Sequence, residues 1–278
     1  MTRNISKIKV GSRLSSSLTV LGILDDRGDE PLYLVWHHKY WCPMLCKVLK
    51  SQQAAQSEAD ILGTLAHPNI VRCLGTDGSA LLMEYLEGPN LHRLLQSRSK
   101  QRLDINDALR ASLYIGAALS HVHDRGLIHL DVKPANIVVV GGRPVLCDFG
   151  IARWQDTPRP SGTRGTEGYI APEEWLCKEI TPAADIFGLG VTLYELLAGR
   201  LPFPEGWDVK HHPQIFRAPT PIRVYRRSVP TGLEKLVLTC LAHDPAERPK
   251  LEELLPSLHG FISRGPSVWP PDFNPTFE

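Results

Sequence analysis

The sequence contains no apolar stretch long enough to cross a lipid bilayer. A membrane-spanning helix needs about 20 consecutive apolar residues, whereas the most apolar short run here, Ile137–Val140, has the length of a β-strand. The polar, weakly basic N-terminus also lacks the apolar core of a secretion signal. We therefore expect no membrane-embedded segment and no entry into the secretory pathway.

An excess of charge of one sign is also missing. The formal net charge is +1, so nothing in the composition favours binding to nucleic acid or to an anionic membrane. With 42% hydrophobic and 22% charged residues, the chain is too apolar to be disordered, and its 278 residues suffice for a large core. These values are typical of a globular enzyme.

The six cysteines are few and far apart, and most lie in apolar runs. This distribution is typical of reduced, buried thiols, and it favours a cytoplasmic protein. Cys42 and Cys46 follow His37 and His38, but no second ligand pair with zinc-finger spacing comes after them. We therefore interpret the two cysteines as neighbours on one face of a strand and expect no zinc site.

The first part of the chain has the pattern of a small β-sheet. Apolar runs separated by turns predict five strands, and the spacing of apolar residues predicts one helix, which should stop before His67-Pro68. The strands are expected at 18–24, 32–36, 44–49, 71–74 and 80–85, and the helix at 53–65.

The remainder of the chain is mainly helical. Helical patterns cover 109–123, 183–198, 231–242 and 250–263, and Gly141-Gly142 predicts a hairpin turn between two short strands. The change in character near Glu87 indicates a boundary between two lobes. We expect four segments: an extension at 1–17, a small lobe at 18–86, a large lobe at 87–263 and a Pro-rich tail at 264–278.

The residues that could carry chemistry cluster after the first long helix. Asp131, Lys133, Asn136 and Asp148 lie within twenty residues, at the ends of short apolar runs. Phosphoryl transfer from a nucleotide needs such a set: one carboxylate to accept a proton, a second carboxylate and an amide to hold Mg²⁺, and a cation to offset the charge on the phosphoryl group. Each residue alone has an ordinary structural explanation, but the whole set in this order does not.

From about residue 18 to 263 the sequence resembles the eukaryotic-type protein kinase family, in its Ser/Thr-kinase-like form. The catalytic-loop motif H-R-D-x-x-x-x-N is matched at His129, Asp131 and Asn136. Lys133 stands where Ser/Thr kinases carry lysine. The other matching features are Asp148-Phe149-Gly150, Gly165–Tyr169, Ala171-Pro172-Glu173, Asp185, which resembles the aspartate that braces the catalytic loop, and Arg248, which resembles the partner of Glu173.

The resemblance implies an α+β, bilobal protein kinase-like fold with a small antiparallel sheet lobe and a larger helical lobe. It implies that Asp131 is the catalytic base, that Lys133 neutralises the γ-phosphoryl charge, and that Asn136 and Asp148 bind Mg²⁺. It also predicts that Asp131, Asp148 and Lys47 converge on one metal-bound triphosphate between the lobes.

In the small lobe, Lys47 matches the lysine that binds the nucleotide phosphates, and Glu58 matches its ion-pair partner. Around adenine, the resemblance implies Met83 as gatekeeper, backbone groups of Glu84 to Leu86, and Val138. Leu62, Cys73, His129 and Phe149 fall where the family stacks its regulatory spine.

One departure from the family is the missing Gly-rich phosphate loop. Counting about fifteen residues back from Lys47 places the loop's glycine positions at Asp25, Arg27 and Glu30, leaving Gly28 as the turn's only glycine. Acidic side chains there would repel phosphates and weaken nucleotide binding, unless the turn points outward. A second alignment places Ser15-Ser16-Ser17 in the loop instead, without restoring a glycine.

Two further departures concern adenine and regulation. Leu45 replaces the alanine that packs on adenine, which narrows the purine slot. Leu130 replaces the catalytic-loop arginine that pairs with a phosphorylated activation loop. We therefore predict activity that is independent of phosphorylation at Thr157, Ser161 and Thr163, although all three could be autophosphorylated.

The sequence thus predicts an ATP- and Mg²⁺-dependent protein kinase acting on Ser/Thr hydroxyls of a protein substrate. The alternative is a pseudokinase, a binding or scaffolding module with weak or no turnover, which Leu45 and the acidic turn favour. A small-molecule phosphotransferase fits less well, because Glu173, Arg248 and the loop around Thr166 are typical of protein kinases. The oligomeric state is left open.

Overall fold

The computed structural model describes residues 8–26, 28–157, 162, 164–203 and 212–262. The described residues form two compact units. The described residues up to Ala66, together with Val71–Glu87, make up the first, and His67–Ile70 with the described residues from Gly88 onward make up the second. Residues 1–7 of the expected extension and the expected tail at 264–278 lie outside the described residues.

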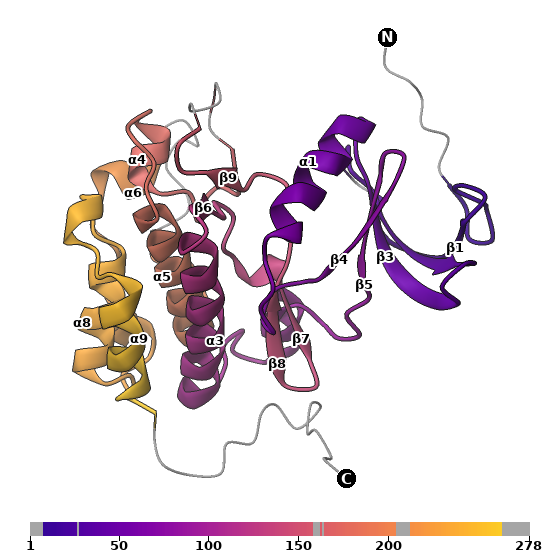
Figure 1. The fold of residues 1–278 in the computed structure, drawn as a ribbon. Helices are drawn as coiled ribbons and strands as arrows, with labels where there is room; N and C mark the ends of the chain where they lie inside the picture. The colour runs from indigo at the N-terminus through magenta and orange to yellow at the C-terminus, as the bar shows by residue number, and fades with distance from the viewer. Residues whose placement is uncertain (1–7, 27, 158–161, 163, 204–211, 263–278) are drawn as a thin grey trace. The chain divides into compact units, whose positions relative to one another are not determined.

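The first unit is built on a five-stranded antiparallel sheet, in the order β1-β2-β3-β5-β4 (Figure 1). Residues alternate between the buried core and the other face, as along β2, because successive side chains point to opposite faces of a sheet. This sheet confirms the expected strand number. Its strands are β1 (Leu18–Asp25), β2 (Leu32–His37), β3 (Cys42–Val48), β4 (Cys73–Asp77) and β5 (Ala80–Glu84).

The turn between β4 and β5 is shorter than the sequence pattern predicts. We expect a turn over Gly75–Gly78, but β4 continues to Asp77. The register shifts between Cys73 and Gly75, and Gly75 has φ +128°. Glycine tolerates this conformation, so the strand accommodates a bulge at Gly75 instead of ending there.

The residues just before β1 pack on the same sheet. Ile8 and Leu14 lie against its core, and the Ser15 hydroxyl donates a 2.6 Å hydrogen bond to the Asp77 carboxylate. Arg13 forms a bridge with Thr19. The described part of the expected extension is therefore integrated with the first unit.

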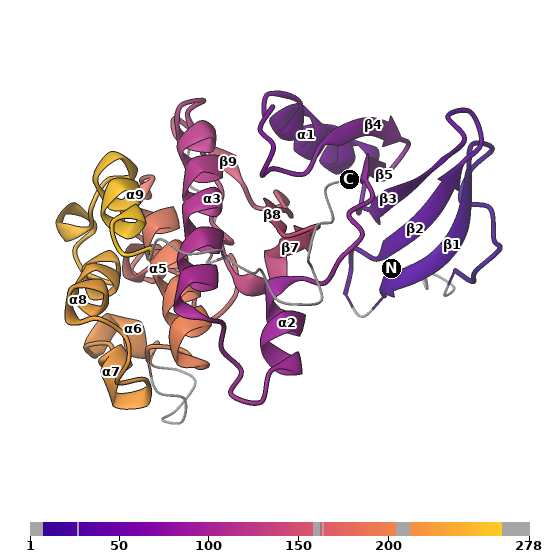
Figure 2. The same ribbon diagram turned by 90° about the horizontal axis from the view of Figure 1, so that it is seen from below.

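The single helix of this unit, α1 (Gln52–Gly63), begins where the Ser51 side chain accepts a hydrogen bond from the Ala54 backbone N–H. Ser is a favoured N-cap because its oxygen satisfies an otherwise unpaired N–H group. The helix packs against β4 and β5 (Figure 2), and its buried positions include Leu62 and Glu58. This packing turns Glu58 away from solvent.

The second unit is organised around two long helices, α3 (Ile105–His123) and α5 (Ala183–Ala198). Almost every residue of α5 is buried, as its mostly apolar sequence predicts. In Figures 1 and 2, α8 (Thr231–Cys240) and α9 (Leu251–His259) lie on one side of α3, and the short hairpin lies on the other. These helices provide the core that positions the loops described below.

The hairpin consists of β7 (Ile137–Val140) and β8 (Arg143–Leu146). Gly141 and Gly142 have φ of +53° and +82°, which a two-residue hairpin turn of the primed type requires. The predicted Gly-Gly turn is confirmed. The backbone carbonyl of Asn69 accepts from the Leu146 N–H, and this attaches His67–Ile70 to the second unit.

Several short elements were not expected from the sequence, because one helical turn or two paired residues leave little periodicity to detect. They are α2 (Leu91–Ser97), β6 (Leu127–Ile128), η1 (Pro134–Asn136), β9 (Arg153–Trp154), α4 (Pro172–Trp175), α6 (Pro213–Phe216), α7 (Ile222–Tyr225) and η3 (Pro245–Glu247).

Candidate active site

The loop that follows β6 is held by a buried carboxylate on α5. Asp185 accepts hydrogen bonds from the backbone N–H groups of His129 (2.9 Å) and Leu130 (2.8 Å), and from Nε2 of His123 (2.8 Å). Burial acts to raise the pKa of Asp185, but these hydrogen bonds and the neighbouring histidines outweigh it and hold the pKa below its usual value. The expected bracing role of Asp185 matches these contacts.

Close contact between α5 and the loop also depends on a glycine. A Cβ atom added to Gly188 would lie 3.2 Å from both the Cβ and the carbonyl oxygen of Val132. The Thr192 hydroxyl, one turn further along α5, donates a 3.3 Å hydrogen bond to the same carbonyl. The loop backbone is thus fixed on both sides of Asp131.

The Asp131 carboxylate lies at the centre of a polar network. Oδ2 is 2.6 Å from Lys133 Nζ and 2.8 Å from Asn136 Nδ2. Oδ1 accepts a 3.0 Å hydrogen bond from the Thr166 hydroxyl, which also accepts one from Lys133 Nζ. The side chain is only 9% exposed. A carboxylate oriented in this way can accept a proton from a nearby hydroxyl group.

Asn136 and Asp148 are brought together by the backbone. The N–H of Cys147, the residue before Asp148, donates a 2.8 Å hydrogen bond to the Asn136 carbonyl. Asp148 is exposed and has φ +61°. One carboxylate and one amide oxygen suit Mg²⁺, which usually takes few protein ligands and completes its shell with water and phosphate oxygens. The donor set therefore fits magnesium carried by a nucleotide.

The rings of His129 and Phe149 form an edge-to-face pair with centroids 4.6 Å apart. Both side chains are almost completely buried. Nε2 of His129 also lies 3.2 Å from the Cys147 carbonyl oxygen. Within the second unit, the loop carrying Asp131 is thereby packed against the segment carrying Asp148.

In the first unit, Lys47 and Glu58 form the predicted ion pair. Lys47 Nζ on β3 is 3.0 Å and 3.2 Å from the two carboxylate oxygens of Glu58 on α1. The side chains are 10% and 4% exposed. A second carboxylate, that of Glu30, lies 3.4 Å from the same ammonium. This third member of the cluster was not expected.

The residues expected around adenine occupy ordinary strand positions. Met83 is buried on β5 directly opposite Leu45 on β3, and Glu84 follows it with its carboxylate bound to the Arg72 backbone N–H. Leu86 is half-buried just beyond the strand. In the second unit, Val138 is half-buried on β7 opposite Val145.

Further along the second unit, Arg248 and Glu173 form a buried ion pair. The two guanidinium nitrogens lie 2.6 Å and 2.7 Å from the two carboxylate oxygens. Arg248 also donates to the carbonyls of Ala183 and Ala242. This pair confirms the partnership expected from the sequence, and it joins the start of α4 to a segment 75 residues away.

Comparison with known proteins agrees with this arrangement. The family model described as "Protein kinase domain" matches residues 37–259. The chain belongs to the protein kinase family. It is 37% identical over 230 residues to the serine/threonine-protein kinase PkaA of Streptomyces coelicolor, and this alignment covers 75% of this chain and 41% of PkaA. It is 30% identical over 256 residues to PrkC of Bacillus subtilis, covering 86% of this chain and 39% of PrkC.

The solved structures include a kinase domain with the same fold. The crystal structure of the PknI kinase domain of Mycobacterium tuberculosis matches with a TM-score of 0.71 and 25% identity, over 91% of this chain and 99% of that one. The protein kinase fold expected from the sequence is thereby confirmed. The chain spans about half, or less, of the length of the first curated relatives.

The structure decides between the two alignments of the missing Gly-rich loop. The turn between β1 and β2 contains Asp26 and Gly28–Pro31, and Arg27 lies outside the described residues. The serine run, Ser15–Ser17, comes before β1. The alignment that puts these serines in the turn is therefore wrong, and the chain has an acidic β1–β2 turn.

Leu130, the residue in place of the catalytic-loop arginine, has φ +67° and uses its backbone N–H to bind Asp185. Thr157 is exposed, and its hydroxyl donates to the Trp154 carbonyl at 2.6 Å. Ser161 and Thr163 lie outside the described residues. Since Leu130 carries no charge, it offers no cation for a phosphorylated loop residue.

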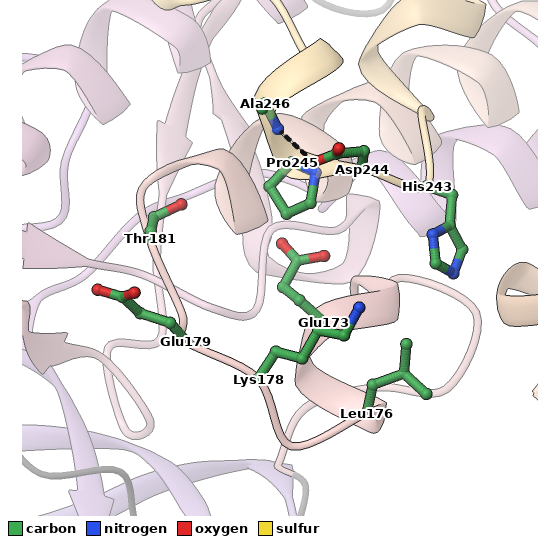
Figure 3. A pocket seen from close by; sticks show the side chains of 9 residues that line it. All are labelled: Glu173, Leu176, Lys178, Glu179, Thr181, His243, Asp244, Pro245 and Ala246. Carbon is green, nitrogen blue, oxygen red and sulfur yellow. Dashed lines mark hydrogen bonds between the residues drawn. The ribbon is translucent and has the colours of Figure 1, made fainter.

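A pocket of about 510 Å³ lies in the second unit beside α4 and η3 (Figure 3). Its wall includes Glu173, with Lys178, His243 and Asp244 around it. None of the catalytic-motif residues Asp131, Lys133, Asn136 and Asp148 lines it. The pocket is therefore separate from the candidate active site.

Two contacts of the site were missed by reasoning from the sequence. His123, in the last turn of α3, binds Asp185, and no motif of the sequence signals this contact. The Glu30 carboxylate contacts Lys47, and the strand pairing of β2 with β3 is the signal that could have placed these two residues near one another. Both contacts depend on tertiary packing.

Within the described residues, no helix has the length and apolar character that crossing a membrane would require. The same part of the chain contains no group of three or more His, Cys, Asp or Glu side chains placed to hold a metal ion.

Proposed function

We propose that this kinase transfers the γ-phosphoryl group of Mg-ATP to a serine or threonine hydroxyl of a protein substrate. The observation that carries the proposal is the network at Asp131, where Lys133, Asn136 and Thr166 converge on one buried carboxylate. An aspartate with a purely structural role needs only enough hydrogen-bond donors to satisfy its two carboxylate oxygens, and those donors can be of any kind. Here the partners are a cation, an amide and a hydroxyl, which are the groups phosphoryl transfer uses.

In this proposal, Asp131 orients the acceptor hydroxyl and takes its proton. Lys133 offsets the negative charge on the phosphoryl oxygens, and it lies close enough to Asp131 to serve both groups. Asn136 and Asp148 hold Mg²⁺, which when bound neutralises phosphate charge. In the first unit, Lys47 binds the nucleotide phosphates and Glu58 positions its ammonium.

For adenine recognition, we propose the backbone of Glu84 to Leu86, with Met83 as the gatekeeper and Val138 contributing apolar contact. Met83 and Leu45 face each other across β5 and β3, so the leucine reduces the space beside Met83. The absence of the catalytic-loop arginine, with Leu130 in its place, supports activity without loop phosphorylation.

The second candidate function is a pseudokinase that binds partners without turnover. Glu30 beside Lys47 favours it, because a carboxylate next to the phosphate-binding lysine opposes nucleotide binding. The oriented Asp131 network argues against it, since a binding module has no need of those contacts. A small-molecule phosphotransferase is disfavoured by the Glu173–Arg248 pair, which is typical of protein kinases.

Incorporation of γ-labelled phosphate into a generic protein substrate tests the proposal. We expect Mg²⁺-dependent labelling on Ser or Thr, identified by phosphoamino-acid analysis, and a loss of about 10²–10⁴-fold in Asp131→Asn. Asp124→Asn, a matched change at an exposed aspartate of the same unit, should leave labelling unchanged. Saturable thermal stabilisation by Mg-ATP without labelling would instead support the pseudokinase.

A further inference from the structure

The acidic β1–β2 turn ends beside Lys47 because of strand register. Leu32, the first residue of β2, pairs directly with Lys47 on β3. The Pro31 carbonyl accepts a 3.0 Å hydrogen bond from the Val48 N–H, which pins the end of the turn to the same strand. Glu30, two residues before the start of β2, is therefore held within reach of the Lys47 ammonium.

The two acidic residues at the end of the turn contact different lysines. The Glu30 carboxylate is 3.4 Å from Lys47 Nζ, and the Asp29 carboxylate is 3.0 Å from Lys50 Nζ. Lys47 and Glu30 are 10% and 37% exposed, whereas Lys50 and Asp29 are 66% and 82% exposed. An ion pair near the protein interior is screened less than one in solvent. The Glu30 contact is thus the less screened of the two.

Lys47 already has a partner for its charge. Both carboxylate oxygens of Glu58 lie within hydrogen-bond distance of Nζ, so Glu30 adds a second negative charge to a single ammonium. A phosphate that approached Nζ would meet this second carboxylate. The two anions would repel each other at short range, and only one of them gains the full attraction of the lysine.

We propose that Glu30 is an internal competitor of nucleotide phosphate for Lys47, so that nucleotide binds only when the Glu30 carboxylate moves away. The proposal rests on the proposed function, in which Lys47 is a phosphate ligand. It makes Glu30 a determinant of nucleotide affinity that acts through Lys47. Its effect depends on the charge of the ligand, because adenosine carries no phosphate to compete with the carboxylate.

Calorimetric titration with Mg-ATP and with adenosine tests this competition. We expect Glu30→Gln, which keeps the size and removes the charge, to bind Mg-ATP about tenfold more tightly than the natural protein. Adenosine affinity should not change. Asp29→Asn is the matched control, because it removes a negative charge from the same turn without changing the contact to Lys47. The affinity of this variant for Mg-ATP should stay within about twofold of that of the natural protein.

Two further variants assign the effect to the lysine and to charge. In a protein that carries Lys47→Ala, adding Glu30→Gln should no longer raise the affinity for Mg-ATP, because the ammonium for which carboxylate and phosphate compete is absent. Glu30→Ala should reproduce the gain, and it replaces the glutamine variant if that protein unfolds below the assay temperature.

Three results would overturn the proposal. If the Glu30 variants bind Mg-ATP like the natural protein, Glu30 does not compete, although the proposed function stands. If Asp29→Asn gives the same gain, the effect is one of general charge. If no variant binds Mg-ATP and none transfers phosphate, both the competition and the proposed function are wrong, and this result differs from the first.

Discussion

The guanidinium of Arg248 and the carboxylate of Glu173 form two parallel hydrogen bonds in the interior of the second unit, where the side chains are 0% and 2% exposed. Bidentate pairing satisfies both charges in a geometry that a lysine could not reproduce. The pair connects α4 to the segment before α9.

Removing one partner of this pair should destabilise the protein strongly. Glu173→Gln leaves Arg248 buried without a counter-charge, so we expect the free energy of unfolding to fall by about 3–5 kcal/mol. Urea unfolding measures it. Glu179→Gln, a change at an exposed glutamate of the neighbouring loop, should stay within about 0.5 kcal/mol. Equal effects of both variants would contradict a stabilising role for the buried pair.

The pKa of Asp185 predicts how stability depends on acid. Because the folded-state pKa lies below the ordinary value, the ionised carboxylate stabilises the fold. The contribution is complete above the pKa of an unfolded aspartate, about 3.9, and is lost as the pH falls through the lower folded-state value. Urea unfolding measures the free energy of unfolding of the natural protein and of Asp185→Asn. The difference between the two values should therefore be constant from about pH 5 upward and should shrink below about pH 4. A difference that grows toward acid would reverse the sign and refute the assignment.

Loop phosphorylation should be dispensable for activity. Leu130 provides no positive charge to pair with a phosphate, so the triple variant Thr157→Ala, Ser161→Ala, Thr163→Ala should keep kcat within about twofold of the natural value. Steady-state kinetics on the purified protein, with phosphosites mapped by mass spectrometry, provide the measurement. A collapse of kcat in the triple variant would show that the loop needs its phosphate.

Leu45 should limit nucleotide affinity by its volume. Leu45→Ala opens space opposite Met83. If the leucine side chain costs about 1–3 kcal/mol of binding free energy by crowding the purine, removing it should tighten nucleotide binding by about 5- to 150-fold. The gain should appear with adenosine as well as ATP, unlike that expected at Glu30, because it concerns the base. Leu45→Ile, which keeps the volume, is the matched control. Equal affinities of all three proteins for both ligands would show that the side chain does not restrict the purine.

The elements of the fold that the sequence predicts well are those with long or local signals. The mostly apolar sequence of α5 and the glycine pair between β7 and β8 are both signals from residues close together in the chain. At β4 the same reasoning fails, since Gly75 in isolation signals a turn. Pairing with β5 instead extends the strand through a bulge, and only the neighbouring strand supplies those hydrogen bonds.

The candidate site divides in a similar way. The ion pairs Lys47–Glu58 and Glu173–Arg248 were predictable, because motif order identifies both partners in each. The contact between Glu30 and Lys47 was missed, because no motif pairs these two residues. Side-chain contact between them depends on the register of two strands, which motifs do not report.

By itself, the sequence determined the family, the order of the long helices and of the strands of the five-stranded sheet, and the residue types available for chemistry, because these follow from local periodicity and from spacing along the chain. Only the tertiary structure decided the contacts that no motif pairs, and the atoms through which the expected partners bind. The Thr166 hydroxyl meets Asp131 across 35 residues, and Asp185 reaches the backbone of His129 across 56. Such contacts form when packing of distant segments outweighs the entropy of closing the loops between them, and that balance is a property of the whole fold.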